Sequence, residues 1–228
     1  MLHSSILGTE RSGRRIEEAL KRGMDIIMAL TGIALGSPLM LVVAIAIKLG
    51  SKGPVFYRGV RVGRYGVPFR MFKFRTMRAD ADKTGVHSTS NDDPRITSVG
   101  RFLRNHKLDE LPQLINILKG EMSLVGPRPE VPYYVDMFTV EEKAILSVRP
   151  GFTDWASLWN SDEGAVLAGS PDPEKTYMEK IRPEKIRLQL EYVRRHTLAT
   201  DIAILFQTVR AVLFRTRPAA MQAVGKEN

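Results

Sequence analysis

Cysteine is absent from this chain of 228 residues. Its absence excludes a disulfide-bonded scaffold, zinc sites built on thiolates, iron–sulfur clusters and a cysteine nucleophile. A chain without cysteine is consistent with a reducing compartment but does not establish one. Any chemistry that this chain performs must come from its other side chains.

Signatures of common metal and nucleotide sites are also missing. The four histidines are scattered along the chain and show no metal-ligand spacing. Neither a Gly-Lys-Ser/Thr P-loop nor a Gly-x-Gly-x-x-Gly motif is present. No unit repeats with a period of about 20–50 residues, which excludes solenoids and propellers. A nucleotide would have to be bound in some other way.

Acidic residues are too few to balance the basic ones. Lys and Arg number 34 and Asp and Glu number 25, which leaves a formal net charge of +9. A basic surplus of this size indicates an anionic partner, such as nucleic acid, a membrane surface or a phosphorylated substrate. A hydrophobic content of 43% excludes a disordered chain and allows a sizeable core.

The run of residues between Asp25 and Lys48 contains no charged side chain. As a straight helix this run would extend roughly 33 Å at about 1.5 Å per residue, enough to cross a bilayer. Pro38 lies in its middle, where it removes one N–H and clashes with the carbonyl four residues earlier, so we predict a kink or a break. Ser37 can hydrogen-bond a carbonyl that is freed there.

Basic residues flank the run on both sides, and between Lys48 and Arg78 the chain has no acidic residue. Basic flanks prefer the cytoplasmic side of a membrane. A re-entrant helix that is broken at Ser37-Pro38 places both flanks on that side, whereas a Pro-kinked transmembrane span places only one there. The residues favour the re-entrant helix and leave the span open.

The remaining elements follow from periodicity and from turn residues. Strands at 55–58 and 69–74, with Gly63, Gly66 and Pro68 between them, predict a β-hairpin. The patterns also predict helices at 97–105, 108–118, 140–148, 184–196 and 198–214, and loops at 79–95 and 161–173. The apolar stripe of the last helix fits packing on the core or a position in the membrane interface.

Adjacent carboxylates at Asp109 and Glu110 are the candidate catalytic groups. Pro112 follows them and predicts a helix start, whose dipole would favour anions and keep Asp109 ionised. A carboxylate at such a place can hold Mg²⁺ with substrate phosphates, or attack phosphorus directly. The alternative is an ordinary Asp cap with a Glu in the first helical turn.

Basic residues supply candidate phosphate contacts. Lys73 and Arg75 end a predicted strand, Arg104 precedes the carboxylates, Arg128 stands between Pro127 and Pro129, and Arg149 precedes Pro150-Gly151. Arginines on a restrained backbone suit bidentate recognition of phosphate. Taken singly, each of them is better explained as a solvated surface charge.

Across about residues 20–214 the chain resembles the bacterial sugar transferases, the monotopic polyprenyl-phosphate phosphoglycosyl transferases. The ordered blocks that carry this resemblance are Lys21-Arg22-Gly23-Met24-Asp25, Ser37-Pro38, Gly53-Pro54-Val55-Phe56-Tyr57, Phe72-Lys73-Phe74-Arg75-Thr76-Met77, Asp93-Pro94-Arg95-Ile96-Thr97, Leu108-Asp109-Glu110-Leu111-Pro112-Gln113-Leu114, Gly126-Pro127-Arg128-Pro129-Glu130 and Val148-Arg149-Pro150-Gly151.

The resemblance implies an α+β fold in which a re-entrant membrane helix precedes a mostly helical cytoplasmic domain with a small β-hairpin and interfacial amphipathic helices. We therefore expect a flexible N-terminal tail at 1–20, the membrane helix at 21–49, the catalytic domain at 50–217 and a C-terminal tail at 218–228. The protein would sit in the bacterial inner membrane with both termini on the cytoplasmic side.

The resemblance also implies the reaction, in which a sugar-1-phosphate passes from a UDP-sugar to undecaprenyl phosphate with release of UMP. Asp109 would be the nucleophile and a Mg²⁺ ligand, and Glu110 its partner. The Pro127-Arg128-Pro129 segment would hold uridine, and Lys73, Arg75, Arg104 and Arg149 would contact substrate. Membrane lipid is expected as a partner and nucleic acid is not; a homo-oligomer stays open.

The sequence departs from the usual family pattern after Arg149, where it reads Pro150-Gly151-Phe152-Thr153-Asp154-Trp155-Ala156-Ser157, and an extra loop follows at about 160–180. The identity of the sugar that this chain uses therefore cannot be inferred from other members of the family. Two further classes stay open, a membrane-tethered metal-dependent nucleotide-sugar hydrolase and a non-enzymatic binder of anionic lipid.

Overall fold

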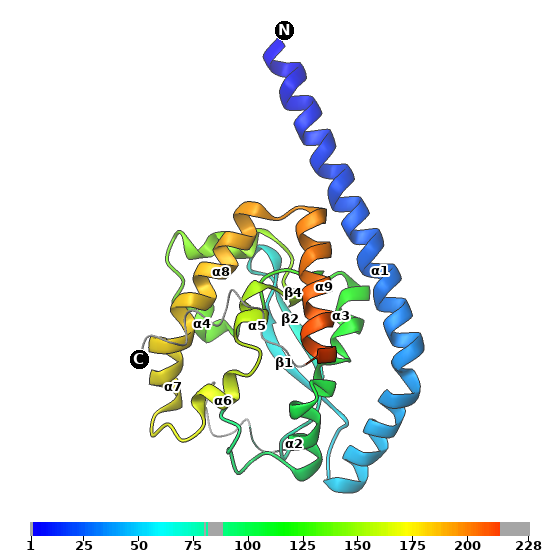
Figure 1. Ribbon diagram of the computed structural model, residues 1–228, viewed down its shortest axis with the longest axis vertical. Coiled ribbons are helices and arrows are strands. Elements are labelled where there is room, and N and C mark those ends of the chain that lie inside the picture. The colour runs from blue at the N-terminus through cyan, green and yellow to red at the C-terminus, as the bar shows by residue number, and fades with distance from the viewer. Residues whose placement is uncertain (1, 80, 82–88, 215–228) are drawn as a thin grey trace.

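The computed structural model describes residues 2–79, 81 and 89–214, with side chains from Ile16 onward. A long helix, α1, runs beside a smaller mixed domain in which helices surround short strands (Figure 1). The predicted C-terminal tail at 218–228 lies outside the described residues. The elements are α1 (Leu2–Gly50), β1 (Phe56–Val62), β2 (Pro68–Phe74), α2 (Ser98–Asn105), α3 (Gln113–Lys119), β3 (Ser123–Val125), α4 (Pro132–Asp136), β4 (Gly151–Thr153), α5 (Trp155–Trp159), α6 (Glu163–Leu167), α7 (Pro173–Thr176), α8 (Arg182–Arg195) and α9 (Leu198–Phe214).

Helix α1 is continuous over 49 residues and contains Pro38, so the predicted break at Ser37-Pro38 is not observed. Proline has no N–H to donate to the carbonyl of Ala34, four residues earlier. The Ser37 hydroxyl donates to that same carbonyl oxygen at 3.0 Å, so the oxygen keeps a partner and the helix continues. Figure 1 shows α1 curving along its length. Its course through a membrane stays a prediction.

The backbone that the sequence assigns to a flexible tail at 1–20 is helical from Leu2 onward. A helix that is already nucleated gains one hydrogen bond for each residue added to its end, so α1 can extend into this polar segment. The segment Ile16–Gly50 is long and apolar enough to cross a membrane. Its apolar side chains are largely exposed, for example 79% for Leu35 and 63% for Leu41.

The predicted β-hairpin is confirmed. Strands β1 and β2 pair antiparallel with Phe56 opposite Phe74 and Val62 opposite Pro68. The connection is a single 3-10 turn, η1 (Arg64–Gly66), in which Tyr65 and Gly66 both have positive φ. This hairpin forms one side of the domain and carries Lys73 near its end.

Strands β3 and β4 form a separate parallel pair. Their chains cross closely just beyond β3, where a Cβ on Gly151 would lie 2.1 Å from the Gly126 nitrogen. Only glycine permits this approach, and the crossing directs the segment from Pro127 to Pro129 away from the sheet. The Gly151 N–H then donates to the Pro127 carbonyl at 2.9 Å.

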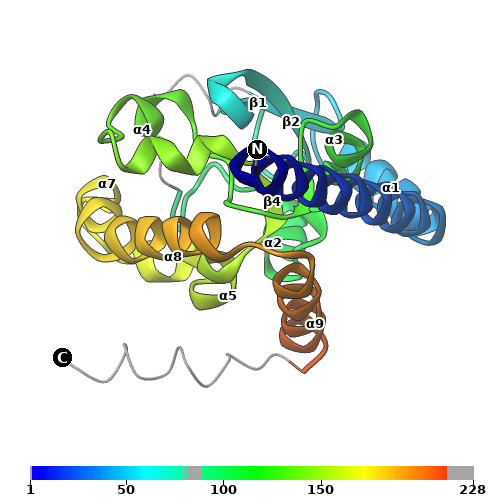
Figure 2. The same ribbon diagram turned by 90° about the horizontal axis from the view of Figure 1, so that it is seen from above.

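The main core lies between α1, the hairpin, α3, β3 and the last two helices. Its fully buried members include Ala29 from α1, Ile117 from α3, Met122, Tyr192 from α8 and Ile204 from α9. Helix α9 has the bounds predicted from its apolar stripe and stands beside α1 in Figures 1 and 2.

Three predicted elements differ in detail. The helix expected at 108–118 begins only at Gln113, and Leu108–Glu110 is a separate 3-10 turn, η3. The segment expected as a helix at 140–148 is a 3-10 turn, η4 (Glu142–Ser147). The loop expected at 161–173 contains α6. Apolar spacing alone does not distinguish one turn of 3-10 helix from α-helix, because both bring residues three apart to one face.

Candidate active site

A cleft of about 1100 Å³ opens between the hairpin, η3, the Pro127–Pro129 segment, the α5–α6 region and α9. Asp109, Glu110, Lys73, Arg104 and Arg128 all line it. The tertiary structure thus joins strand β2, the end of helix α2, the η3 turn and the proline-bounded segment around Arg128. Both carboxylates and several of the basic residues singled out in the sequence share this one cavity.

Asp109 lies in η3, and the residue before this turn, Lys107, is in the left-handed region with φ 56°. The Asp109 residue is 7% exposed. Within the described part of the chain, no hydrogen bond or ion pair reaches its carboxylate. Burial raises the pKa of Asp109 above its ordinary value, and nearby Lys73 opposes that rise.

The expectation that a helix dipole lowers the pKa of Asp109 is therefore wrong. The α-helix begins at Gln113, beyond Asp109, so the carboxylate is not at its first turn. Removal from water penalises the charged form of a carboxylate, and no direct partner compensates here. A buried carboxylate that faces a cleft without a partner is suited to meet a ligand.

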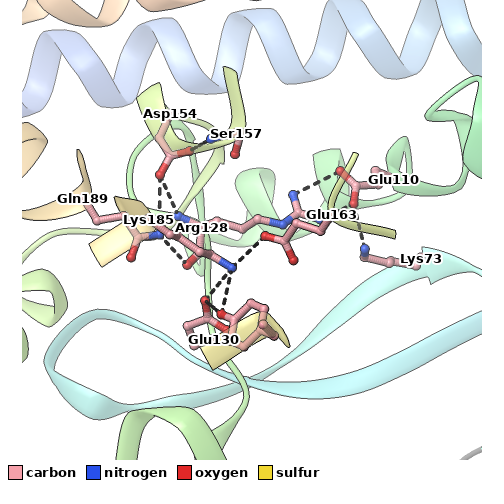
Figure 3. Close-up of polar contacts among 10 residues, drawn as sticks. Lys73, Glu110, Arg128, Glu130, Asp154, Ser157, Glu163, Lys185 and Gln189 are labelled. Atoms are coloured by element: carbon pink, nitrogen blue, oxygen red, sulfur yellow. Dashed lines mark hydrogen bonds and ion pairs between the residues drawn. The ribbon is translucent and has the colours of Figure 1, made fainter. Parts of the chain in front are cut away.

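Glu110 has the opposite surroundings. Its carboxylate lies 2.7 Å from the Lys73 Nζ and forms a two-pronged ion pair with the Arg128 guanidinium (Figure 3). Burial alone would raise the pKa of Glu110, but Arg128 and Lys73 hold it well below the usual range. Glu110 is thus a permanent anion that fixes two cations beside Asp109.

The two cations respond differently to this environment. Burial lowers the pKa of Lys73, although Glu110 opposes that effect. Glu110 raises the pKa of Arg128 above its already high value. Arg128 therefore stays charged at any physiological pH, and its planar fork meets the carboxylate in the geometry that arginine favours.

Backbone contacts also fix the position of Arg128. Its N–H donates to Asp154 Oδ2 at 3.2 Å, and its carbonyl accepts from Gln189 Nε2 at 3.3 Å. Pro127 and Pro129 on either side restrict the chain further. Helix α8, which supplies Gln189, thereby holds the segment that presents Arg128 to the cleft.

The other predicted phosphate contacts lie in different places. Arg104 lines the cleft and donates from Nε to Thr76 Oγ1 at 3.0 Å. Arg75 also lines the cleft, but it is 5% exposed and donates to the carbonyls of Ser51 and Lys52, just after α1. These contacts tie the end of α1 to strand β2 and occupy much of the Arg75 guanidinium.

Arg149 is not among the residues that line the cleft. Its Nε donates to the Gly120 carbonyl at 3.2 Å, at the end of α3. The structure therefore brings Lys73, Arg104 and Arg128 together with Asp109 and Glu110, and leaves Arg149 on another part of the domain.

A second charged cluster was missed in the sequence. The Lys185 Nζ lies 2.7 Å from Glu130, 3.0 Å from Glu163 and 3.3 Å from the Tyr177 hydroxyl (Figure 3). Lys185 and Gln189 are four residues apart in α8, so they lie on one face with buried Tyr192. Polar residues on an otherwise buried helical stripe were the signal that could have found them.

Metal binding would need ligands beyond the protein. The described residues contain no group of three or more His, Cys, Asp and Glu side chains that could hold a metal ion. Lys73 and Arg128 occupy the Glu110 carboxylate, whereas the Asp109 carboxylate has no partner within residues 16–79, 81 and 89–214. Mg²⁺ commonly takes one or two carboxylates and completes its shell with water and substrate phosphates, and this donor set fits that pattern.

Comparisons with known proteins show which family the chain resembles. A family model described as "Bacterial sugar transferase" matches residues 16–215. The chain is 40% identical over 197 residues to the UDP-N-acetylgalactosamine-undecaprenyl-phosphate N-acetylgalactosaminephosphotransferase of Aeromonas hydrophila, covering 85% of this chain and 44% of the relative.

Two further relatives are named UDP-glucose:undecaprenyl-phosphate glucose-1-phosphate transferase. The protein from Escherichia coli is 39% identical over 198 residues, which cover 85% of this chain and 40% of the relative. The protein from Caulobacter vibrioides is 37% identical over 196 residues, which cover 85% of this chain and 69% of the relative. The chain thus spans less than half the length of the Aeromonas and Escherichia relatives.

Proposed function

The chain belongs to the bacterial sugar transferase family, and we propose that it transfers a sugar-1-phosphate from a UDP-sugar to undecaprenyl phosphate, with release of UMP. This transfer would be the first membrane step in the assembly of a surface glycan. The observation that carries the proposal is the buried Asp109 carboxylate, which faces the cleft beside two cations held by Glu110 and has no partner among the described residues. The names of the relatives support the two substrates.

The transfer proceeds in two displacements. An Asp109 carboxylate oxygen attacks the β-phosphorus of the UDP-sugar, the bond from that phosphorus to the bridging oxygen breaks, and UMP leaves. A phosphate oxygen of the lipid then attacks the same phosphorus and frees Asp109. Both substrates are anions, and a covalent enzyme intermediate avoids holding them at the reacting phosphorus together.

Glu110 acts by positioning. It holds Lys73 and Arg128 next to Asp109, where their remaining N–H groups can meet phosphate oxygens. Arg104 adds a third cation on the same cleft. Asp109 is the residue to hold Mg²⁺ together with the substrate diphosphate, and a bound Mg²⁺ would neutralise charge on that diphosphate.

The apolar helix supports membrane association, and we assign to it a re-entrant course with the cleft on the cytoplasmic side. The basic flanks carry this assignment, because both prefer the cytoplasm. A curved, continuous α1 that enters and leaves on one side is compatible with the Ser37 hydroxyl bond to the Ala34 carbonyl at 3.0 Å. The lipid phosphate would then reach the cleft from the membrane surface.

Release of UMP tests the proposal. Purified full-length chain is mixed with each of several UDP-sugars and Mg²⁺, with and without undecaprenyl phosphate. We expect continuous UMP release only when the lipid phosphate is present, and at most one UMP per enzyme without it. Equal continuous release without lipid would indicate a hydrolase, and no release with any donor would favour a binder of anionic lipid.

A further inference from the structure

One carboxylate on the cleft wall has no role in the reaction above. Glu163 is the first residue of α6 and lines the cleft, and its side chain is 35% exposed. Its Oε1 lies 3.0 Å from the Lys185 Nζ. Among the described residues, no hydrogen bond reaches its second oxygen, which is therefore able to accept one from a ligand.

Neutralising Lys185 does not by itself explain Glu163. Lys185 is buried and already has the Glu130 carboxylate at 2.7 Å, so one cation is met by two carboxylates. The contact between Lys185 and Glu163 instead holds the Glu163 side chain in one orientation. A carboxylate that is held in place before the ligand arrives loses little entropy on binding.

The wall that carries Glu163 is tied to a neighbouring segment of the chain. The Asn91 N–H donates to the Gly164 carbonyl at 3.0 Å, and Asn91 Nδ2 donates to Asp162 Oδ1 at 3.0 Å. The packing is so close that a Cβ on Gly164 would lie 2.2 Å from Asn91 Oδ1. These contacts fix the position of helix α6 at the cleft.

Two more polar groups on this wall are unsatisfied. The Ser157 hydroxyl and the Asn160 Nδ2 are shielded from water and have no hydrogen-bond partner in the part of the chain that the structure describes, and both residues line the cleft. Buried polar groups in proteins normally have partners, and an unmet one costs about 1–3 kcal/mol. A rotation of either side chain toward the cleft would let a polar ligand satisfy it.

The position of Glu163 identifies the part of the donor that it would meet. Glu163 lines the same cleft as Asp109, Lys73 and Arg128, and Figure 3 shows its side chain next to that of Arg128, one of the cations that Glu110 holds. Burial opposes the ionisation of Glu163, but Lys185 and Arg128 keep its pKa below the ordinary value. In the proposed reaction the sugar is bonded to the phosphorus that Asp109 attacks, whereas the nucleotide leaves on the opposite side. A carboxylate repels phosphate and accepts hydrogen bonds from hydroxyl groups.

We propose that Glu163 accepts a hydrogen bond from a hydroxyl of the donor's sugar, and that with Ser157 and Asn160 it forms the subsite that selects among UDP-sugars. This inference rests on the proposed function. Overall similarity does not make that choice, because relatives at 40% and 39% identity are named for N-acetylgalactosamine and glucose.

The test uses Glu163→Gln in the full chain with undecaprenyl phosphate. The measurements are kcat/KM for UDP-glucose, UDP-galactose, UDP-N-acetylglucosamine and UDP-N-acetylgalactosamine, and the inhibition constant of UMP, which lacks the sugar. We expect kcat/KM for the preferred donor to fall about tenfold or more and its preference over the other donors to shrink. The UMP inhibition constant should stay within about twofold, which also reports an intact cleft.

The matched control is Glu179→Gln, since Glu179 is 60% exposed and pairs only loosely with Lys175. Glu179→Gln should leave kcat/KM for every donor and the UMP inhibition constant unchanged. Glu163→Asp keeps the charge but withdraws the carboxylate, and we expect the same loss as for the glutamine variant. Unchanged donor preference in both Glu163 variants would overturn the proposal, as would an equal rise in the UMP inhibition constant, which would assign Glu163 to the nucleotide.

Failure of the proposed function would look different. It would be seen in the wild type, as no UMP release from any donor, and would overturn both proposals. Failure of the Glu163 assignment alone would leave wild-type UMP release intact and would be seen only in the variants.

Discussion

Asp109 and Glu110 are neighbours in the chain, yet their carboxylates meet opposite surroundings. Glu110 is bound by two cations, whereas Asp109 is buried without a partner among the described residues. Burial favours a higher pKa for both carboxylates. For Glu110 the ion pairs with Arg128 and Lys73 outweigh burial and lower the pKa, whereas for Asp109 burial dominates and the pKa rises. Groups whose environments separate their pKa values in this way usually divide chemical roles between them.

Asp109→Asn should abolish transfer without destabilising the fold. We expect UMP release to fall by at least about three orders of magnitude, because an amide cannot act as the nucleophile. The raised pKa of Asp109 means that its ionised form costs stability above that pKa, and the neutral amide removes this cost. Its melting temperature should therefore be at least as high as that of the wild type.

Mass spectrometry gives the complementary check on Asp109. After incubation with UDP-sugar alone, the wild type should gain one sugar phosphate at Asp109 and the Asp109→Asn variant should not. Kinetics that require both substrates to be bound at once, with no adduct trapped, would contradict the two-step reaction and leave Asp109 as a metal ligand.

The pH profile should reflect the surroundings of Asp109. Because burial raises its pKa, the nucleophile loses its charge at a higher pH than an ordinary aspartate with pKa 3.8. The acid limb of kcat/KM, which reports the free enzyme, should therefore lie above that value. Lys73 opposes the rise, so Lys73→Met should move the limb to still higher pH.

Lys119→Met provides the comparison for Lys73→Met. Lys119 is 47% exposed and pairs with Glu121 outside the cleft, so its removal should leave the acid limb in place. If the acid limb of kcat/KM moved equally in Lys73→Met and Lys119→Met, the cause would be a general effect of net charge. No movement in Lys73→Met would show that a group other than Asp109 sets the limb.

At the scale of elements, one turn of α1 makes a set of polar contacts with three other elements, in addition to the apolar packing of Ala29, Val43 and Ile47 further along the helix. Arg22 donates to the carbonyls of Ile117 and Leu118 at the end of α3, at 2.6 and 2.9 Å. The buried Asp25 carboxylate accepts from Ser123 and Leu124 in β3 at 3.0 and 2.9 Å. The third member of this turn, Lys21, reaches α9.

Lys21 forms an ion pair with Asp201, whose other oxygen accepts from the Tyr192 hydroxyl at 2.7 Å. Asp201 is 1% exposed, so α1, α8 and α9 meet at one buried carboxylate. Asp201→Ala removes the carboxylate that Lys21 and Tyr192 share and leaves them only the Val125 carbonyl, at 2.9 and 3.2 Å. Because Lys21 loses its charge partner, we expect a loss of about 3–5 kcal/mol in the free energy of unfolding.

Glu141→Ala serves as the control for Asp201→Ala, because the Glu141–Arg194 pair is exposed on both sides. We expect Glu141→Ala to lower the free energy of unfolding by less than about 1 kcal/mol. Thermal unfolding of both variants in the same detergent measures the difference. Equal melting temperatures would show that α1 does not depend on the Asp201 contact.

At the scale of the whole molecule, exposed apolar side chains gather on two helices that stand next to each other (Figures 1 and 2). Helix α9 buries Ile204 in the core yet exposes 70% of Phe206 and 71% of Leu213. Of the predicted stripe, only Leu205 packs against the core, whereas Ile202, Phe206, Val209, Val212 and Leu213 are exposed. The core-packing alternative is therefore wrong for most of the stripe, and its position in a membrane interface stays a prediction. Lys73, Asp109 and Val212 of α9 line the same cleft.

Topology can be measured directly because the chain has no cysteine of its own. We expect Ser5→Cys and Val60→Cys both to resist a membrane-impermeant thiol reagent in intact cells, since a re-entrant α1 places both flanks inside. Val60 is 41% exposed, so its protection would not come from burial in the fold. Labelling at position 5 alone would establish a spanning helix.

Local patterns in the sequence determined the elements that need only neighbouring residues. Alternation with Gly63, Gly66 and Pro68 predicted the hairpin, and the apolar stripe predicted α9 with its bounds. Thr97 caps α2 by accepting from the Gly100 N–H at 2.9 Å, which is also a local contact. Pairing and capping of this kind depend on residues a few positions apart.

Tertiary structure alone decided which charged residues meet. Lys73 and Arg128 reach Glu110, whereas Arg75 and Arg149 bind backbone carbonyls, although all four look alike in the sequence. Lys185 lies 55 residues from its partner Glu130. The protonation of Asp109 likewise depends on burial by distant segments, because the field at a carboxylate sums over everything packed around it. The sequence therefore identified the carboxylates, and only the fold could say what each one faces.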